Sequence, residues 1–144
     1  MNRAAPTLPL AAFLPVSVDT AGGYGNEKSV GQAIRDSGVP RGDVFVISKV
    51  AKHKTTADKQ TVLDACEASL ADLGLGYIDL YLIHWPVPGA IVPAWQALQQ
   101  LQRAGKVRQI GVSNFEAKHL EALFKASPAV KPALNQIESH PFHT

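Results

Sequence analysis

The sequence predicts an α/β fold: a partial (β/α)8 TIM barrel with about five parallel strands alternating with four helices. Short apolar segments rich in β-branched and aromatic residues alternate with segments of helical periodicity, joined by short connections. Each apolar segment also ends in a polar residue, and barrels gather functional groups at the C-terminal ends of many strands. An open doubly wound sheet is the alternative, but no G-x-G-x-x-G motif follows the first strand.

Composition excludes several classes of protein. The chain has 144 residues, 46% of them hydrophobic and 18% charged, which is typical of one globular domain. A formal net charge of +2, with scattered lysines and arginines, does not favour nucleic-acid binding. No apolar run is long enough to span a membrane, and prolines interrupt the weakly apolar start, so no signal peptide is expected. The single cysteine, Cys66, is expected in the core, and a cytoplasmic location is predicted.

The first half of the chain contains two strand-and-helix units. A short strand is expected over residues 14–19, and the glycine-rich segment 20–25 allows a tight loop beside a ligand. A helix is expected from Asn26, as its cap, to about Ser37. Asp43–Lys49 contains four consecutive apolar residues, which is typical of a strand covered on both faces.

The remaining elements continue the alternation. Pro86 follows the apolar run that ends at Ile83, and because proline cannot donate to a ladder it marks the end of that strand. Trp95 is expected to face inward from its helix. The expected strands are 78–83, 107–112 and 133–137, and the expected helices are 57–73, 90–104 and 116–126.

Four residues near the strand ends suggest acid–base chemistry. Parallel strands bring their C-terminal ends to one rim, so Asp19, Lys49 and His84 are expected together, beside Tyr24 of the glycine-rich loop. Asp19 can pair with Lys49, whose ammonium would stabilise the phenolate of Tyr24 and make it a usable proton donor. His84 can donate a hydrogen bond to a substrate oxygen. The alternative for Tyr24 is packing over its loop.

Other polar residues suggest a cofactor but no metal. None of the acid–base residues carries a hydride, so a reduction needs a cofactor. Ser113, Asn114 and Gln136 suit recognition of a carboxamide such as that of nicotinamide. A metal is not expected, because Glu138, His140 and His143 fit no tight zinc pattern. His119, on its helix, is expected to be solvated.

Five motifs carry a resemblance to the aldo-keto reductase family, and in particular to its bacterial diketogulonate reductase-like members. They cover nearly everything from Val18 onward. The matching segments are Asp19–Glu27 (DTAGGYGNE), Ser48–Val50 (SKV), Ser69–Pro86 (SLADLGLGYIDLYLIHWP), Gly105–Phe115 (GKVRQIGVSNF) and Asn135–Glu138 (NQIE) with His140–Pro141.

The resemblance implies reduction of small aldehydes and ketones with NADPH. It implies that Tyr24 is the general acid of a catalytic tetrad. The implied catalytic residues are Asp19, Tyr24, Lys49 and His84; the implied cofactor contacts are Asp19, Ser113, Asn114 and Gln136; and the implied substrate contacts are Tyr24, His84 and Trp85. Trp85 is otherwise expected to pack in the core or at the rim.

The chain also departs from the family pattern. Residues 1–13 resemble nothing in the family and are interpreted as an unrelated extension, with 14–144 as the partial barrel. A TIM barrel typically has about 250 residues, and the family's last two βα units are not recognised here, so we expect a fragment with unpaired edges that can self-associate. Two alternatives remain: a non-catalytic nucleotide-binding or regulatory protein, and a half-barrel completed by self-association.

Overall fold

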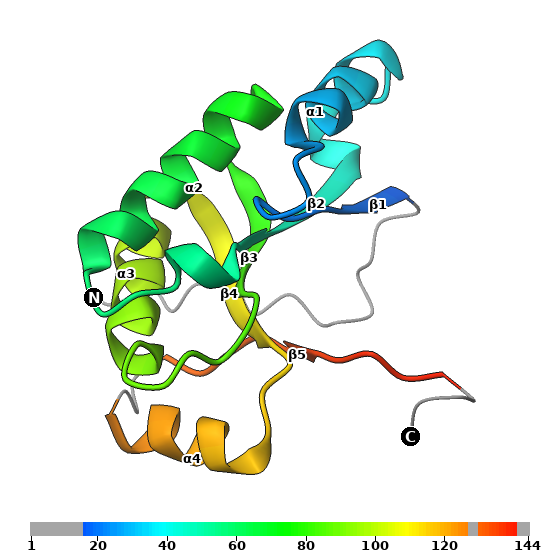
Figure 1. The fold of residues 1–144 in the computed structure, drawn as a ribbon. Coiled ribbons are helices and arrows are strands. Elements are labelled where there is room, and N and C mark those ends of the chain that lie inside the picture. Colours follow the sequence, from blue (N-terminus) through cyan, green and yellow to red (C-terminus); the bar gives the residue numbers. More distant parts are fainter. Residues whose placement is uncertain (1–15, 127–129, 141–144) are drawn as a thin grey trace, which may run out of the picture.

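The computed structural model describes residues 16–126 and 130–140, which form a curved, all-parallel sheet covered by helices (Figure 1). The strand order is β1-β2-β3-β4-β5, which is the chain order expected of a partial barrel, so the predicted fold is confirmed. The predicted extension, residues 1–13, lies outside the described residues. The strands are β1 Val16–Asp19, β2 Val44–Val50, β3 Ile78–Ile83, β4 Val107–Ser113 and β5 Asn135–Gln136. The helices are α1 Glu27–Asp36, α2 Lys59–Leu73, α3 Ile91–Arg103 and α4 Ala117–Ala126, with short 3-10 turns η1 Arg41–Asp43 and η2 Lys52–Lys54.

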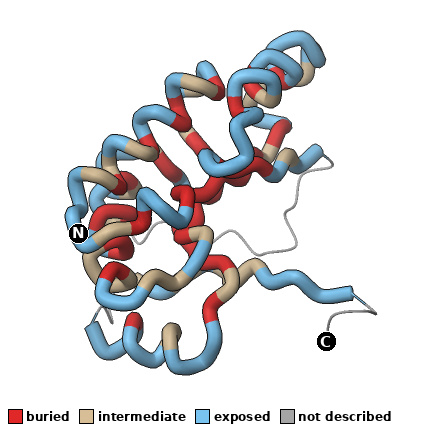
Figure 2. The backbone as a smooth tube through the Cα atoms, in the orientation of Figure 1, coloured by how far each residue is buried: buried red, intermediate tan, exposed pale blue. Residues whose placement is uncertain are grey.

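The main hydrophobic core lies between the helices and one face of the sheet. Cys66 and Trp95 are fully buried in it, as the sequence predicts. Burial raises the pKa of the Cys66 thiol to about 12, so this cysteine stays protonated and serves as a small apolar residue. Figure 2 shows the buried residues concentrated in the central strands and on the helix faces turned toward them.

A second, smaller cluster lies on the other face of the sheet. Ile47, Leu80 and Leu82 are buried there, with Phe45 and Leu134 packed against them. Successive side chains of a strand point to opposite faces, so these residues define the face that would form the inside of a barrel. This face leads directly to the candidate site.

Helix boundaries follow local capping more closely than they follow the apolar pattern. α2 begins two residues later than expected because the carboxylate of Asp58 accepts a hydrogen bond from the Gln60 backbone N–H (3.1 Å). Gly74 ends α2 in the left-handed conformation. Asn26 is in the predicted cap position of α1, but its side chain makes no capping bond and instead accepts from the Thr20 hydroxyl (2.7 Å).

The sheet has two edges within the described residues. β1 pairs with β2 alone, and β5 pairs with β4 alone. An apolar groove of about 200 Å³ runs between β1 and α1, lined mainly by Val16, Val18, Val30, Ile34 and Val44. Among the described residues, no helix is long and apolar enough to cross a bilayer.

Candidate active site

The strand pattern brings the candidate residues to one end of one face. Ile47 is on the barrel-interior face, so Lys49, two residues further along β2, points to the same face at the C-terminal end. The same alternation carries Leu80 and Leu82 of β3 to His84, just past the end of the strand. β1 ends beside them at Asp19, whose Cα partner is Ile47.

Lys49 is the buried charge of the site. It is only 1% exposed. Its ammonium forms an ion pair with the Asp19 carboxylate, the pair that the sequence predicts, and donates a hydrogen bond to the Thr20 carbonyl (3.0 Å). An ammonium at this depth needs such partners to offset its lost hydration, so Asp19 and the start of the following loop fix its position.

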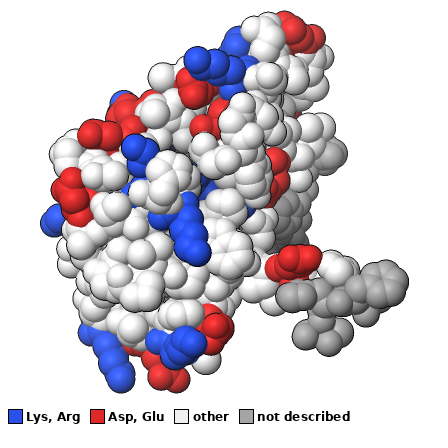
Figure 3. Space-filling view, viewed as in Figure 1, with Lys and Arg blue, Asp and Glu red and all other residues white. Residues whose placement is uncertain are grey.

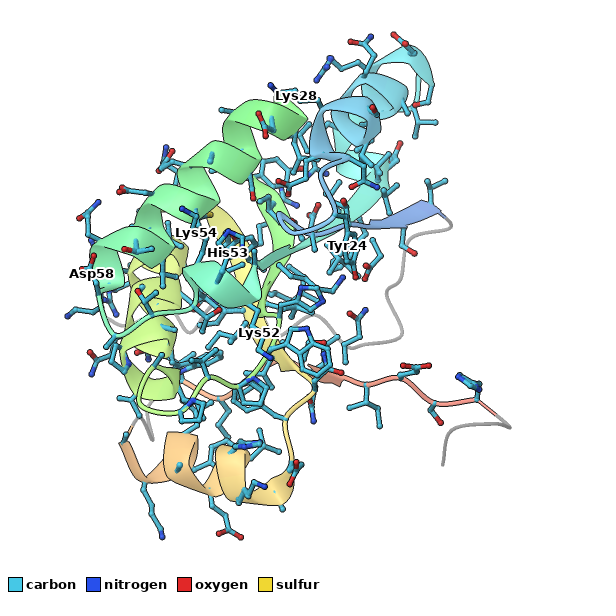
Figure 4. All side chains as sticks on the ribbon, in the orientation of Figure 1. Tyr24, Lys28, Lys52, His53, Lys54 and Asp58 are labelled. Atoms are coloured by element: carbon cyan, nitrogen blue, oxygen red, sulfur yellow. The ribbon has the colours of Figure 1, made fainter. Side chains whose placement is uncertain are left out.

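Tyr24 lies on the loop after β1 (Figure 4), and its ring is close to this ammonium. The Lys49 Nζ lies 5.2 Å from the centre of the Tyr24 ring, and the ring itself is 54% exposed. Two backbone hydrogen bonds hold the loop against the sheet, from Gly22 N–H to the Lys49 carbonyl (3.0 Å) and from Tyr24 N–H to the Ala21 carbonyl (2.9 Å). Tyr24 is therefore held near the charge while staying open to a ligand.

His84 lies between Tyr24 and Trp85 in the candidate site. Its ring centre is 5.6 Å from that of Tyr24, in an edge-to-face arrangement, and 6.1 Å from that of Trp85. Burial lowers the pKa of His84 from 6.5, and the nearby Lys49 ammonium lowers it further, while Asp19 acts in the opposite direction. His84 is therefore neutral at neutral pH. Trp85 is 42% exposed, and so it lies at the rim rather than in the core.

The three amide and hydroxyl residues join this network from β4 and β5. Gln136 Nε2 donates to the second Asp19 oxygen (2.7 Å), and Asn114 Nδ2 donates to the His84 carbonyl (2.9 Å). The Ser113 hydroxyl donates to the Gln136 carbonyl (2.9 Å). Asn114 has φ of 59°, in the left-handed region, and turns the chain away from the end of β4. All residues singled out for catalysis and cofactor binding thus lie around one rim.

The sequence interpretation missed a buried carboxylate behind the loop. Glu27, in the first turn of α1, is only 6% exposed, and its Oε1 accepts a hydrogen bond from the Ser48 hydroxyl (2.6 Å). Ser48 lies on the opposite face of β2 from Lys49. The signal available in the sequence was Ser48, which with Lys49 interrupts an apolar strand, because a buried hydroxyl needs a partner.

Two histidine predictions have different outcomes. His119 was expected to be solvated, and it is only half-buried: its Nδ1 accepts a hydrogen bond from the Glu116 N–H (3.1 Å), and its ring centre lies 5.8 Å from that of Phe115. His140 pairs with Glu138 (2.8 Å), whereas His143 lies outside the described residues. Residues 16–126 and 130–140 contain no group of three or more metal-binding side chains.

Comparison with known proteins agrees with this geometry. The chain is 48% identical over 125 residues to a glyoxal reductase of Bacillus subtilis, covering 87% of this chain and 44% of that protein. A crystal structure of an aldo/keto reductase from Brucella melitensis superposes with a TM-score of 0.84 at 45% identity, over 89% of this chain and 49% of that one. A Bombyx mori aldo-keto reductase in complex with NADP superposes with a TM-score of 0.76 at 38% identity, over 85% of this chain and 43% of that one.

The chain thus spans a little under half the length of the relatives it matches. The model of the aldo/keto reductase family matches residues 16–144, which is most of the chain. This protein belongs to the aldo/keto reductase family.

Proposed function

We propose that this chain carries the proton-donating part of a site that reduces aldehydes and ketones to alcohols with NADPH. The observation that carries the proposal is the buried Lys49 ammonium, held by Asp19 beneath the exposed Tyr24 and beside His84. Family membership supports it, as does the activity for which the Bacillus subtilis glyoxal reductase is named.

Tyr24 is the proposed proton donor. A phenol gives up its proton more readily when a fixed positive charge stabilises the phenolate, and Lys49 supplies that charge. His84 is neutral at neutral pH, so it can orient a carbonyl oxygen by a hydrogen bond without adding a second positive charge to the site. The carbonyl oxygen would lie between the Tyr24 hydroxyl and the His84 ring.

The residues on β4 and β5 fit a nicotinamide carboxamide. Their amide nitrogens already donate to Asp19, His84 and Ser113, so the side-chain oxygens of Asn114 and Gln136 remain as acceptors for a carboxamide NH₂. A reduced nicotinamide would supply the hydride that no side chain here can provide. The Bombyx mori relative, solved with NADP, supports this assignment.

Replacing the proposed proton donor tests the proposal. Tyr24→Phe should lower the turnover of a simple aldehyde with NADPH by about 10²–10⁴-fold, because general acid catalysis is lost. The exposed ring remains in the variant, so its unfolding midpoint should match that of the native chain.

Tyr77→Phe is a matched control for this variant. The Tyr77 ring lies just before β3, at the opposite end of the strands, 4.1 Å from the Arg41 guanidinium and 3.8 Å from that of Arg108. Removal of the Tyr77 hydroxyl should leave the turnover of the aldehyde unchanged. Full activity in Tyr24→Phe would show that the proton comes from another group, and NADPH binding without any turnover by the native chain would favour the non-catalytic alternative.

We also propose that the unpaired edges of β1 and β5 allow the half-barrel to associate with a second copy. The support is that each strand pairs on one side only among the described residues, beside an apolar groove. A cytoplasmic location stays a prediction.

A further inference from the structure

A positively charged turn lies directly beside the proposed site. η2 follows β2 and contains Lys52, His53 and Lys54, all exposed. The Lys52 Nζ lies 5.7 Å from the centre of the Trp85 ring. Tyr24, His84, Trp85 and Lys52 therefore follow one another around the rim, and 6.1 Å is the longest step between neighbours.

Lys52 differs from Lys49, the buried cation of the site, in having no acidic partner. Lys49 pairs with Asp19. Within residues 16–126 and 130–140, no carboxylate lies within salt-bridge distance of Lys52. Figure 3 shows basic side chains near the middle of this face bordered by uncharged surface.

The contact with Trp85 leaves the ammonium able to bind an anion. A cation over an exposed ring keeps N–H donors for other partners, because the ring attracts the charge without accepting all of its hydrogen bonds. The ring and the ammonium together offer an apolar surface that ends in a positive charge. A ligand that matches this pattern has a flat or apolar body and a negatively charged end.

We propose that the carbonyl substrates of this site also carry a carboxylate. Lys52 binds this carboxylate, and Trp85 contacts the part of the substrate between the carbonyl and the carboxylate. The proposal rests on the proposed carbonyl reduction, since it assigns the carbonyl end of the substrate to Tyr24 and His84. Lys52 is then a specificity-determining residue, with no part in proton transfer.

The turn itself offers a charge-matched control. Lys54, two residues along, lines a shallow groove on α2 with Thr61, Asp64, Ala65 and Ala68. Figure 4 shows Lys52 and Lys54 on opposite sides of η2. Lys52→Met and Lys54→Met therefore remove the same charge from the same turn, but only the first removes it from the rim.

The test compares two aldehydes of nearly equal size, 4-carboxybenzaldehyde and its neutral methyl ester. The 144-residue chain should prefer the carboxylate, and Lys52→Met should lower kcat/KM for it about tenfold, as expected for one charge-assisted hydrogen bond. Lys54→Met should leave kcat/KM unchanged for both aldehydes, and Lys52→Arg should keep the preference for the carboxylate. Added salt should weaken the preference because Lys52 is exposed.

A binding measurement separates failure of this inference from failure of the proposed function. Calorimetric titration with 4-(hydroxymethyl)benzoate needs no turnover, and Lys52→Met should weaken it about as much as it lowers kcat/KM, whereas the neutral methyl ester should bind both proteins equally. Reduction of both aldehydes with no dependence on Lys52 would overturn the inference alone. No reduction of either aldehyde, with Lys52-dependent binding retained, would overturn the proposed function alone. Weaker NADPH binding in Lys52→Met, with unchanged carboxylate binding, would assign Lys52 to the cofactor and overturn the inference.

Discussion

His84 is surrounded by groups that hold it in the neutral form. Because burial and Lys49 lower the pKa of His84 below 6.5, its NMR titration should have a midpoint below that value. Between the lowered pKa of the folded chain and the ordinary value of 6.5, the unfolded chain binds the proton more strongly than the folded chain. The contribution of His84 to the free energy of unfolding therefore rises as pH increases through this window. An NMR midpoint at or above 6.5 would contradict the prediction.

A single substitution can separate the two causes of this pKa shift. Lys49→Met removes the second cause and leaves burial, the larger one, in place. The midpoint of His84 should therefore move upward. A native-like amide spectrum is the required control, since Lys49 is fully enclosed and its loss leaves Asp19 without its ion-pair partner.

At the scale of residues, the sequence predicted that the candidate residues lie close together, but it did not predict the hydrogen bonds that join them. Asp19, Lys49 and His84 were predictable because each ends an apolar segment, and parallel strands end at one rim. The bond from Gln136 to Asp19 joins residues 117 positions apart, and side-chain geometry over that separation has no local signal. Lys52 was similarly overlooked, because a lysine in a polar loop is ordinary until the structure places it beside Trp85.

At the scale of elements, α1 and α2 approach so closely that one glycine is required. A Cβ added to Gly31 would lie 1.9 Å from the Leu73 carbonyl oxygen, which is a backbone atom that cannot rotate away. Gly→Ala in a helix normally stabilises by about 0.5–1 kcal/mol. Gly31→Ala should instead lower the free energy of unfolding by about 2 kcal/mol or more, as for an overpacked core. Urea unfolding measures this difference.

Gly76→Ala provides the control for this measurement. Gly76 has open space around its Cα and no left-handed φ, so its substitution should leave the urea midpoint nearly unchanged. A Gly31→Ala variant as stable as Gly76→Ala would show that the two helices can separate without cost.

The sequence pattern predicts which helices and strands form better than it predicts where each one begins and ends. The five strands and four helices of the described part of the chain were all expected, because apolar segments alternate with segments of helical periodicity. The last strand is the weakest match: it was expected over 133–137, but the regular strand covers only Asn135–Gln136. The chain just before it still bonds to β4, from the Ala133 N–H to the Ile110 carbonyl (2.9 Å) and from the Val112 N–H to the Leu134 carbonyl (3.0 Å). A strand with one neighbouring strand can form ladder bonds on one side only. The sequence alone does not show how many neighbouring strands a segment has.

At the scale of the whole molecule, β1 has a strand on one side only among residues 16–126 and 130–140. Thr20 N–H donates to the Ile47 carbonyl (2.9 Å), so by the alternation of a parallel ladder the N–H of Val18 also points toward β2. The N–H of Ser17 then points away from β2, toward the open edge. An edge with free donors beside an apolar groove favours pairing with another chain.

This geometry predicts that the chain self-associates through β1 and that proline distinguishes the two sides of the strand. Proline cannot donate a hydrogen bond, so Ser17→Pro should shift the chain toward monomer in size-exclusion light scattering while preserving its melting temperature. Val18→Pro is the matched control, and it should lower the melting temperature because it removes a bond of the β1–β2 ladder. A native chain that is a monodisperse monomer, or a Ser17→Pro variant that associates as before, would show that β1 is not the associating edge.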